Sequence, residues 1–392
     1  MTPAARIAAA IGLLDRWLGG EPLEKALTTW GRENRYAGSG DRAAIRDHVF
    51  DAVRRRRSYA ALGGAISGRG LMLGSLRASG QDAAAVFTGA GHAPEPLTAE
   101  EAAHPIPGMS EAEALDCPDW LLPRFQDSLG ADTAPVLQAL RDRAPVFLRA
   151  NLLRATRDDV IAALAPEGIA ARPHPLARTA IEVTEGARRI QSSVTFTSGL
   201  AELQDAASQA VVEMLPLGDG QRVLDYCAGG GGKSLAMAAR AAISVDAHDA
   251  DPARMRDLPA RAARAGANIR PMTTAAVRRA APYDLVLLDV PCSGSGSWRR
   301  SPEAKWNLTS ERLTELLKIQ AQILDTASEM VAPAGWLAYA TCSLLQEENA
   351  AQIAAFRDRH EGWEVLAERR FTPLDGGDGF YCAVLRRTGI QS

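Results

Sequence analysis

The sequence predicts an α/β protein whose C-terminal half contains a mostly parallel, doubly wound sheet. Apolar segments typical of buried strands recur at residues 222–226, 243–248, 283–290 and 336–340. Helix-like stretches separate them, and this alternation is typical of parallel sheets covered by helices. A chain of 392 residues has room for two or three domains. We expect a helical segment over residues 1–119, a small α+β unit over 120–200, and the α/β domain over 201–392.

The first segment has the apolar spacing of amphipathic helices. Ile7, Ile11, Leu14 and Leu18 form one stripe, and a second helix is expected around residues 45–53. Eleven basic and seven acidic side chains within residues 1–60 give a local charge of 11 − 7 = +4. Four prolines then predict a loop-rich stretch without helices, at Pro94, Pro96, Pro105 and Pro107.

The middle segment carries the signals of a small α+β unit. Residues 146–149 and 181–183 suit strands, and Thr156 and Asp159 have the spacing of a capping box that opens a helix over residues 160–164. The third segment begins with a helix-like stretch over residues 205–215. The Ala-rich stretch 234–242, after the first strand, predicts another helix.

Composition excludes several protein classes. The 44 basic and 47 acidic residues leave a net charge of −3, so any polyanion site must be local. Apolar runs near 20 residues and a signal-peptide layout are both missing, which predicts a cytoplasmic protein with no membrane partner. Five cysteines without a CxxC spacing, and six scattered histidines, argue against a disulfide framework and against a zinc site.

A glycine-rich loop follows the first predicted strand of the α/β domain and opens a helix. Such loops let the backbone approach a ligand closely. The loop consists of Cys227, Ala228, Gly229, Gly230, Gly231, Gly232 and Lys233.

Three ligands compete for this loop. The run from Gly232 to Ser234 ends like a Walker A motif, and residues 285–289 resemble a Walker B strand, but Cys227 occupies the position of the first glycine. The dinucleotide pattern GxGxxG also lacks its last glycine. The third ligand is S-adenosylmethionine. Asp249, 24 residues after Asp225, can accept hydrogen bonds from ribose hydroxyls, which favours a ribose ligand without separating NAD from S-adenosylmethionine.

Two cysteines follow two later strands. Cys292 comes after the strand at 283–288 and Cys342 after the strand at 336–340. If these strands are neighbours, both thiols face the pocket of the glycine loop, because strand carboxyl ends line the crevice of such sheets. A thiolate that adds to C6 of a pyrimidine activates C5 toward a methyl donor, and Asp289 can stabilise the polarised base.

These residues together resemble the Sun/Nop-type RNA cytosine-5 methyltransferases, and most closely the bacterial small-subunit rRNA methyltransferase group with a NusB-like helical domain. The motifs that carry the resemblance are residues 227–233, 289–294, 299–306, 339–343, 347–349 and 378–380, with 148–151 and 204–205 upstream.

The resemblance implies a Rossmann-like methyltransferase domain, preceded by a small α+β RNA-binding unit and a NusB-like RNA-binding domain. It implies that Cys342 is the nucleophile, that Cys292 assists release of the product, and that Asp289 contacts the cytosine. Residues 227–233, Asp249 and Asp289 would hold S-adenosylmethionine. Two departures are Gly230, where the family usually has proline, and residues 272–274, where it often has an acid near the adenine.

The resemblance implies RNA as the substrate, with 16S rRNA as the first choice and the target base unpaired or flipped out. We expect Arg299, Arg300 and Lys305 beside the pocket, and the arginines at 54–57, to contact phosphates. The protein is expected to be a monomer. Three alternatives remain: methylation of another RNA such as tRNA, a P-loop-like ATPase, and a non-catalytic RNA-binding assembly factor.

Overall fold

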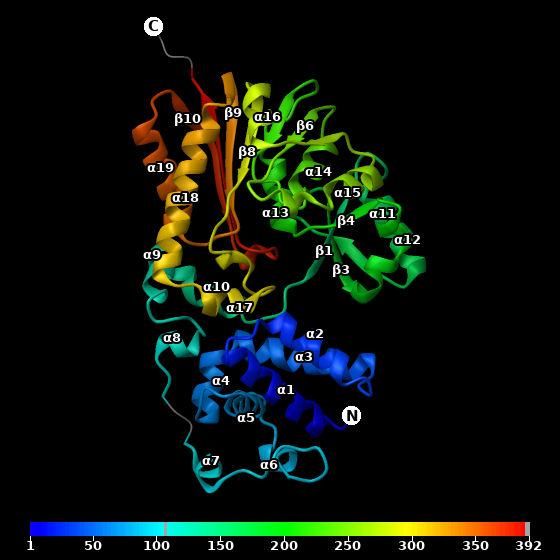
Figure 1. The fold of residues 1–392 in the computed structure, drawn as a ribbon, viewed down its shortest axis with the longest axis vertical. Helices are drawn as coiled ribbons and strands as arrows, with labels where there is room; N and C mark the ends of the chain where they lie inside the picture. The colour runs from blue at the N-terminus through cyan, green and yellow to red at the C-terminus, as the bar shows by residue number, and fades with distance from the viewer. Residues whose placement is uncertain (106–107, 389–392) are drawn as a thin grey trace. The chain divides into compact units, whose positions relative to one another are not determined.

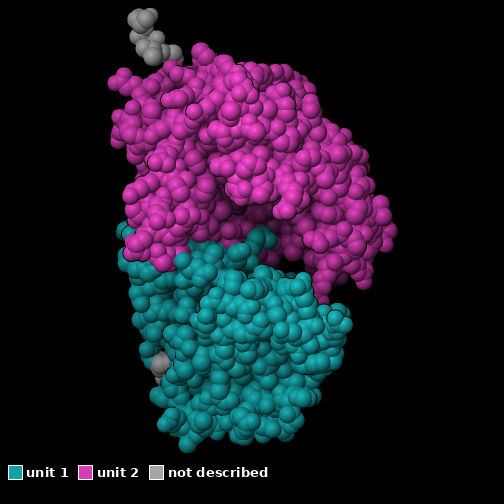
Figure 2. All heavy atoms as spheres, in the orientation of Figure 1, with its two compact units in different colours: residues 1–143, 298–307 teal, residues 144–297, 308–392 magenta. Residues whose placement is uncertain are grey.

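The chain forms two compact units in the computed structural model, which describes residues 1–105 and 108–388. Unit 1 comprises residues 1–143 and 298–307, and unit 2 comprises residues 144–297 and 308–392 (Figure 2). Each unit therefore contains parts that are distant in the sequence. Within the described residues, no helix is long and apolar enough to cross a bilayer.

Unit 1 is helical. Its helices are α1 (Pro3–Leu18), α2 (Leu23–Glu33), α3 (Ser39–Arg54), α4 (Arg56–Gly63), α5 (Gly68–Ala78), α6 (Ala83–Val86), α7 (Ala99–Ala103), α8 (Glu111–Ala114), α9 (Leu122–Leu129), α10 (Thr133–Ala139) and α17 (Pro302–Asn307). The predicted apolar stripe of α1 is confirmed. Ile7 and Leu14 are buried in the core of this unit, and Ile11 and Leu18 pack against it.

Helices α4 and α5 pack with their backbones nearly in contact. A Cβ atom at Gly63 would lie 1.8 Å from the carbonyl oxygen of Gly70, and one at Gly74 would lie 1.9 Å from that of Tyr59. Only glycine permits this approach. The prediction that residues 94–107 contain no helix is wrong in part, because α7 lies between Pro96 and Pro105. Its capping box at Thr98 and Glu101 stabilises a single turn.

Residues 298–307 lie far along the chain but complete the helical unit. The Trp298 ring packs edge-on against Phe125 with a centroid separation of 5.9 Å. Trp306 Nε1 donates to the carbonyl oxygen of Val53 (2.7 Å), and Lys305 Nζ donates to that of Arg54 (3.2 Å). This segment is therefore an integral part of unit 1.

Unit 2 begins with the predicted small α+β module. It comprises β1 (Val146–Ala150), α11 (Arg157–Leu164), β2 (Ala170–Pro173), β3 (Ala180–Glu185), α12 (Val194–Thr197) and β4 (Ala201–Leu203). The strands form an antiparallel sheet in the order β2-β3-β1-β4. The capping box predicted at Thr156 and Asp159 is present and opens α11.

The rest of unit 2 is a seven-stranded sheet in the order β10-β11-β9-β8-β5-β6-β7. Its elements are α13 (Ala206–Glu213), β5 (Arg222–Asp225), α14 (Gly232–Ala238), β6 (Ser244–Ala247), α15 (Leu258–Ala265), β7 (Ile269–Pro271), α16 (Thr274–Ala280), β8 (Tyr283–Asp289), α18 (Ser310–Ser328), β9 (Val331–Thr341), α19 (Ala350–Arg359), β10 (Trp363–Phe371) and β11 (Phe380–Arg387). Strands β5 to β9 pair in parallel, whereas β11 pairs antiparallel with both β9 and β10. The expected doubly wound fold is confirmed, and β10 and β11 are additions that the sequence analysis missed.

Helices cover both faces of this sheet (Figure 1). Alternate strand residues explain the arrangement. Val223 and Leu285 face a core shared with α13 and α14, whereas Leu224 and Val286 face a core shared with α16, α18 and α19. The central strands are buried on both sides, so they consist of continuous apolar residues.

Candidate functional site

The carboxyl ends of four parallel strands form the edge at which the candidate site lies. β5 ends at Asp225 and leads into the glycine loop, and β8 ends at Asp289, before Cys292. β8 and β9 are paired neighbours, as expected, so Cys292 and Cys342 follow adjacent strands. Open α/β sheets bind ligands at this edge.

The glycine loop is held by Asp249. Its Oδ2 atom accepts the backbone N–H of Gly229 (2.9 Å) and Nη1 of Arg254 (3.0 Å). Gly231 has a φ of +78°, and a Cβ atom there would lie 2.1 Å from Cδ1 of Leu258. Glycine is therefore required at this position both for conformation and for space. Ala228 also belongs to the loop, and its N–H donates to the carbonyl oxygen of His248 (2.8 Å).

Asp225 lies buried beneath the loop. Ser234 donates to its Oδ2 atom (2.6 Å), whereas its Oδ1 atom has no partner among the described residues. Burial raises the pKa of Asp225 to about 7. An unpaired buried acceptor of this kind fits a ligand that brings its own hydrogen-bond donor.

Lys233 pairs with Asp289 across the site. The Nζ–Oδ2 distance is 2.6 Å, and the lysine is buried whereas the Asp289 side chain is 31% exposed. Burial alone would lower the pKa of Lys233, but the neighbouring carboxylate outweighs it and raises the pKa. The lysine stays charged and faces the ring of Phe380, with Nζ 5.0 Å from its centroid. Asp289 therefore keeps an accessible carboxylate beside a fixed positive charge.

The two thiols meet at this edge. The Sγ atoms of Cys292 and Cys342 are 3.4 Å apart, within hydrogen-bonding distance. A hydrogen bond from Cys292 lowers the pKa of Cys342, and the same contact raises the pKa of Cys292 well above its ordinary value. Lys233 acts in the same direction on Cys342. Cys342 is thus the sulfur favoured as thiolate, and thiolates are the nucleophilic form.

Three further polar side chains lie in or near the cofactor region that was predicted from the sequence. Burial raises the pKa of the Cys227 thiol, which keeps it protonated. In the region where the resemblance led us to look for an acid, Thr274 Oγ1 lies 2.9 Å from Nε2 of His248, and Thr273 caps α16. Both hydroxyls are therefore engaged within unit 2.

The expected RNA-contacting residues lie in unit 1 and are mostly buried. Arg299 is 5% exposed and Lys305 is 4% exposed, whereas Arg300 is exposed. The guanidinium of Arg54 donates to the carbonyl oxygen of Arg299 (2.8 Å), and burial lowers the pKa of Lys305 to about 8. Arg57 binds Asp119 within the same unit. The buried side chains stabilise the helical unit. Of Arg299, Arg300 and Lys305, only Arg300 has an exposed side chain.

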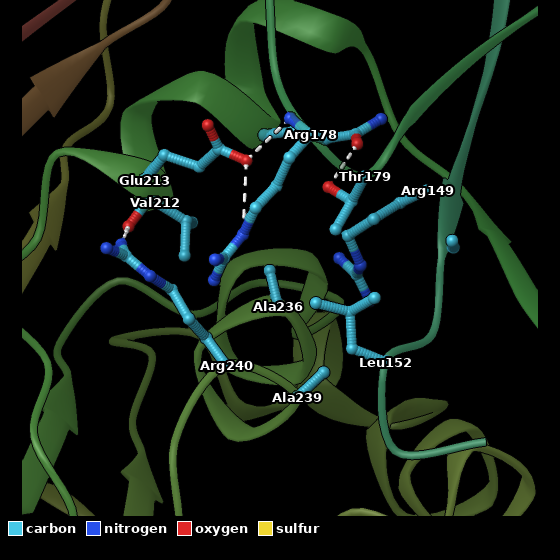
Figure 3. Close-up of a pocket in the computed structure, with 11 residues that line it drawn as sticks. Arg149, Leu152, Arg178, Thr179, Val212, Glu213, Ala236, Ala239 and Arg240 are labelled. Atoms are coloured by element: carbon cyan, nitrogen blue, oxygen red, sulfur yellow. Dashed lines mark hydrogen bonds and ion pairs between the residues drawn. The ribbon is translucent and has the colours of Figure 1, made fainter. Parts of the chain in front are cut away.

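A small cavity lies elsewhere in unit 2, between the α+β module and helices α13 and α14 (Figure 3). It encloses about 20 Å³, which is room for water rather than for a nucleoside ligand. Arg149 lines it and donates to the carbonyl oxygen of Gly232 (2.8 Å) and to the side chain of Gln204. The α+β module therefore helps to hold the glycine loop in place through Arg149. This contact was not predicted from the sequence.

The fold and the candidate site together define the class of protein to which this chain belongs. A glycine loop and an acid after each of two strands, at the carboxyl edge of an open and mostly parallel sheet, are features of a Rossmann-like enzyme that uses a nucleoside cofactor. Residues 212–386 match the family model described as 16S rRNA methyltransferase RsmB/F, and residues 117–189 match that of an RsmF/B-like, ferredoxin-like domain. The chain belongs to this RsmB/F family of methyltransferases.

Curated relatives with the name ribosomal RNA small subunit methyltransferase B match this chain. The one from Serratia proteamaculans is 31% identical over 285 residues, covering 68% of this chain and 66% of that protein. The one from Photorhabdus laumondii is 32% identical over 291 residues, covering 69% and 66%. The crystal structure of PH0851 shares the fold, with a TM-score of 0.76 and 22% identity over 98% of this chain and 99% of that one. The alignments thus span 66% of the length of the curated relatives.

Proposed function

We propose that this protein transfers a methyl group from S-adenosylmethionine to C5 of a cytosine in RNA, with small-subunit rRNA as the substrate. The observation that carries the proposal is the 3.4 Å contact between Cys292 and Cys342 at the ends of neighbouring strands. The names of the curated relatives support the choice of rRNA over tRNA.

The loop residues suit the methyl donor. S-adenosylmethionine supplies an electrophilic methyl group on a sulfonium sulfur. Asp249 accepts hydrogen bonds from Gly229 and Arg254 at Oδ2 and from the backbone N–H of Asp251 at Oδ1 (3.0 Å). Its two oxygens have capacity for one more, so it can also accept a ribose hydroxyl. The unpaired Oδ1 atom of Asp225 suits a donor group such as an ammonium.

Cys342 begins the reaction as a thiolate. Its sulfur forms a bond to C6 of the cytosine, and the C5–C6 π electrons become available at C5. Asp289, held by Lys233 at 2.6 Å, accepts a hydrogen bond from the amino group of the cytosine and so orients the polarised base. C5 then forms its bond to the methyl carbon while the old carbon–sulfur bond breaks, its electron pair remaining on the donor sulfur.

Cys292 completes the reaction. Once Cys342 is bonded to C6, it no longer accepts the hydrogen bond that raises the pKa of Cys292, and Cys292 can release its proton to water. The resulting thiolate removes the proton from C5. The C5–H electrons restore the double bond, the C6–sulfur bond breaks, and its electron pair returns to Cys342. One proton is released in total.

The test is methylation of defined RNA. We expect labelled methyl groups from S-adenosylmethionine to appear as 5-methylcytidine in 16S rRNA. Absence of 5-methylcytidine from all ribosomal and transfer RNAs would refute the proposal, and methylated tRNA alone would replace the substrate. Calorimetry with ATP tests the P-loop alternative, and measurable turnover excludes a purely non-catalytic assembly factor.

A further inference from the structure

A buried glutamate connects the two loops that carry the cysteines. Glu348 is fully buried, and its Oε1 atom accepts the backbone N–H of Ser293 (2.8 Å). Its Oε2 atom accepts the hydroxyls of Ser293 and Ser343. These two serines directly follow Cys292 and Cys342, so one carboxylate fixes both loops.

A second side chain strengthens this connection. Gln320, buried on α18, donates from Nε2 to Oε1 of Glu348 (3.0 Å) and to the carbonyl oxygen of Pro291 (2.9 Å). Pro291 precedes Cys292. The loop is therefore held on both sides of its cysteine.

The position of Glu348 is itself determined by the sheet. The hydroxyl of Tyr339 on β9 donates to the Glu348 carbonyl oxygen (2.6 Å). The next residue, Asn349, donates from Nδ2 to the carbonyl oxygen of Ser343 (2.9 Å). The glutamate can therefore not move without moving the loop after β9.

Burying a carboxylate is unfavourable unless donors compensate for the water it loses. Glu348 has four donors: one backbone N–H, two hydroxyls and one amide. They use the acceptor capacity of its two oxygens. Such a site is specific in geometry, because any displaced donor would leave a buried charge partly unpaired.

We propose that Glu348 is a positioning residue, whose carboxylate holds the loops after β8 and β9 in the register that brings the sulfurs of Cys292 and Cys342 into contact. This inference rests on the proposed function for its catalytic meaning, but the geometry it describes can be measured without RNA.

The charge of Glu348 also acts on both thiols. Cys342 is faced by Cys292, Asp289, Lys233 and Glu348, and the glutamate raises the pKa of Cys342 against the lowering effect of Cys292 and Lys233. It raises the pKa of Cys292 as well. Glu348→Gln keeps the shape, removes the charge and introduces an amide NH2 among the donors. It should loosen the register of the loops. This loosening removes the hydrogen bond from Cys292, which is the largest influence on the pKa of Cys342, and this outweighs the loss of the glutamate's charge. The pH at which Cys342 ionises should therefore rise.

The first experiment measures the alkylation of Cys342 by iodoacetamide as a function of pH, with the labelled peptide identified by mass spectrometry. In Glu348→Gln we expect the midpoint to rise by about half a pH unit or more, because the hydrogen bond from Cys292 is lost with the register. Glu361→Gln, an exposed glutamate between α19 and β10, is the matched control and should leave the midpoint unchanged. A midpoint that is unchanged or falls in Glu348→Gln would overturn the proposal, because it would show that the contact between the two sulfurs survives without the carboxylate.

The second experiment measures methylation. Glu348→Gln should lower kcat at least about tenfold while KM for RNA stays within about twofold, because the residue touches neither substrate. Ser343→Ala removes one donor and keeps the charge, so it should lower kcat without lowering the alkylation midpoint. Wild-type kcat in both variants would overturn the inference. If wild-type protein methylates no RNA, the proposed function fails, and alkylation still decides the role of Glu348.

Discussion

The sulfur atoms of Cys292 and Cys342 lie 3.4 Å apart, close enough to share one proton. This contact distinguishes two residues that have the same side chain. The sulfur that accepts the hydrogen bond is stabilised as thiolate, and the sulfur that donates it stays protonated. Because Lys233 also favours the charged form of Cys342, the two thiols can have different roles.

The first prediction concerns these roles. Cys292→Ala should accumulate a covalent protein–RNA adduct, because Cys342 can still attack C6 but release is blocked. Cys342→Ala should form no adduct, and both variants should lose at least about 1,000-fold in kcat. Denaturing gel electrophoresis with labelled RNA detects the adduct. Adduct in Cys342→Ala, with none in Cys292→Ala, would reverse the assignment.

The second prediction compares two neighbouring glycines. Gly231→Ala places a Cβ atom 2.1 Å from Leu258 in a left-handed backbone conformation, and should destabilise unit 2 by about 2–4 kcal/mol and weaken binding of the methyl donor. Gly230→Ala meets only the end of the Arg261 side chain, at 3.0 Å, and should cost less than about 1 kcal/mol. Calorimetric unfolding and titration with S-adenosylmethionine measure both effects. Equal losses in the two variants would contradict this account of the loop.

The third prediction concerns Asp249. Asp249→Asn removes the charge that holds Gly229 and Arg254, so the Kd for S-adenosylmethionine should rise at least about tenfold. Asp257→Asn, an exposed aspartate nearby in the sequence, is the control and should bind as wild type does. Isothermal titration gives both constants, and an unaltered Kd in Asp249→Asn would remove this residue from the proposed cofactor site.

The fourth prediction concerns pH and Lys305. Burial lowers the pKa of Lys305 to about 8 in the folded protein, against an ordinary value of 10.5. The folded state therefore binds fewer protons than the unfolded state between these values, and stability rises with pH across this window. The unfolding free energy of the wild type minus that of Lys305→Met should increase between pH 8 and 10.5, by on the order of 2 kcal/mol.

Pulse proteolysis in urea, read on peptides of α3, follows unit 1 selectively. The comparison with Lys305→Met cancels the titration of other groups. If the difference in unfolding free energy between the wild type and Lys305→Met is constant across this pH range, burial does not destabilise the charged form of Lys305.

The strands that position the site were predictable because their signals are local. β5, β6 and β8 lie within about a residue or two of the predicted segments, since each is a short apolar run bounded by turn residues. β9 begins at Val331, earlier than predicted, because Pro333 and Gly335 interrupt the apolar pattern. β10 is a charged edge strand, and its exposed residues conceal the usual alternation.

The remaining features depend on distant parts of the chain. Trp298 and Lys305 beside an arginine are typical of an RNA-binding segment, and the same residues serve equally well to pack a helical unit. One sequence does not distinguish the two uses. Glu348 lies in the motif at residues 347–349, but the sequence did not predict its structural role. A buried carboxylate is recognised only from the donors around it, and these come from positions 293–343 in the chain.

Residues 298–307 belong to the helical unit but are translated long after its other helices. The nascent chain presents α1 to α10 before Trp298 and Trp306 have been translated, so the contacts of these tryptophans with Phe125 and Val53 can form only after the glycine loop and Cys292 have been synthesised. Domains usually fold in order as they leave the ribosome. In this protein, the N-terminal helical unit can complete its fold only after residues 298–307 have been translated. The loop that carries Cys292 has then already been synthesised.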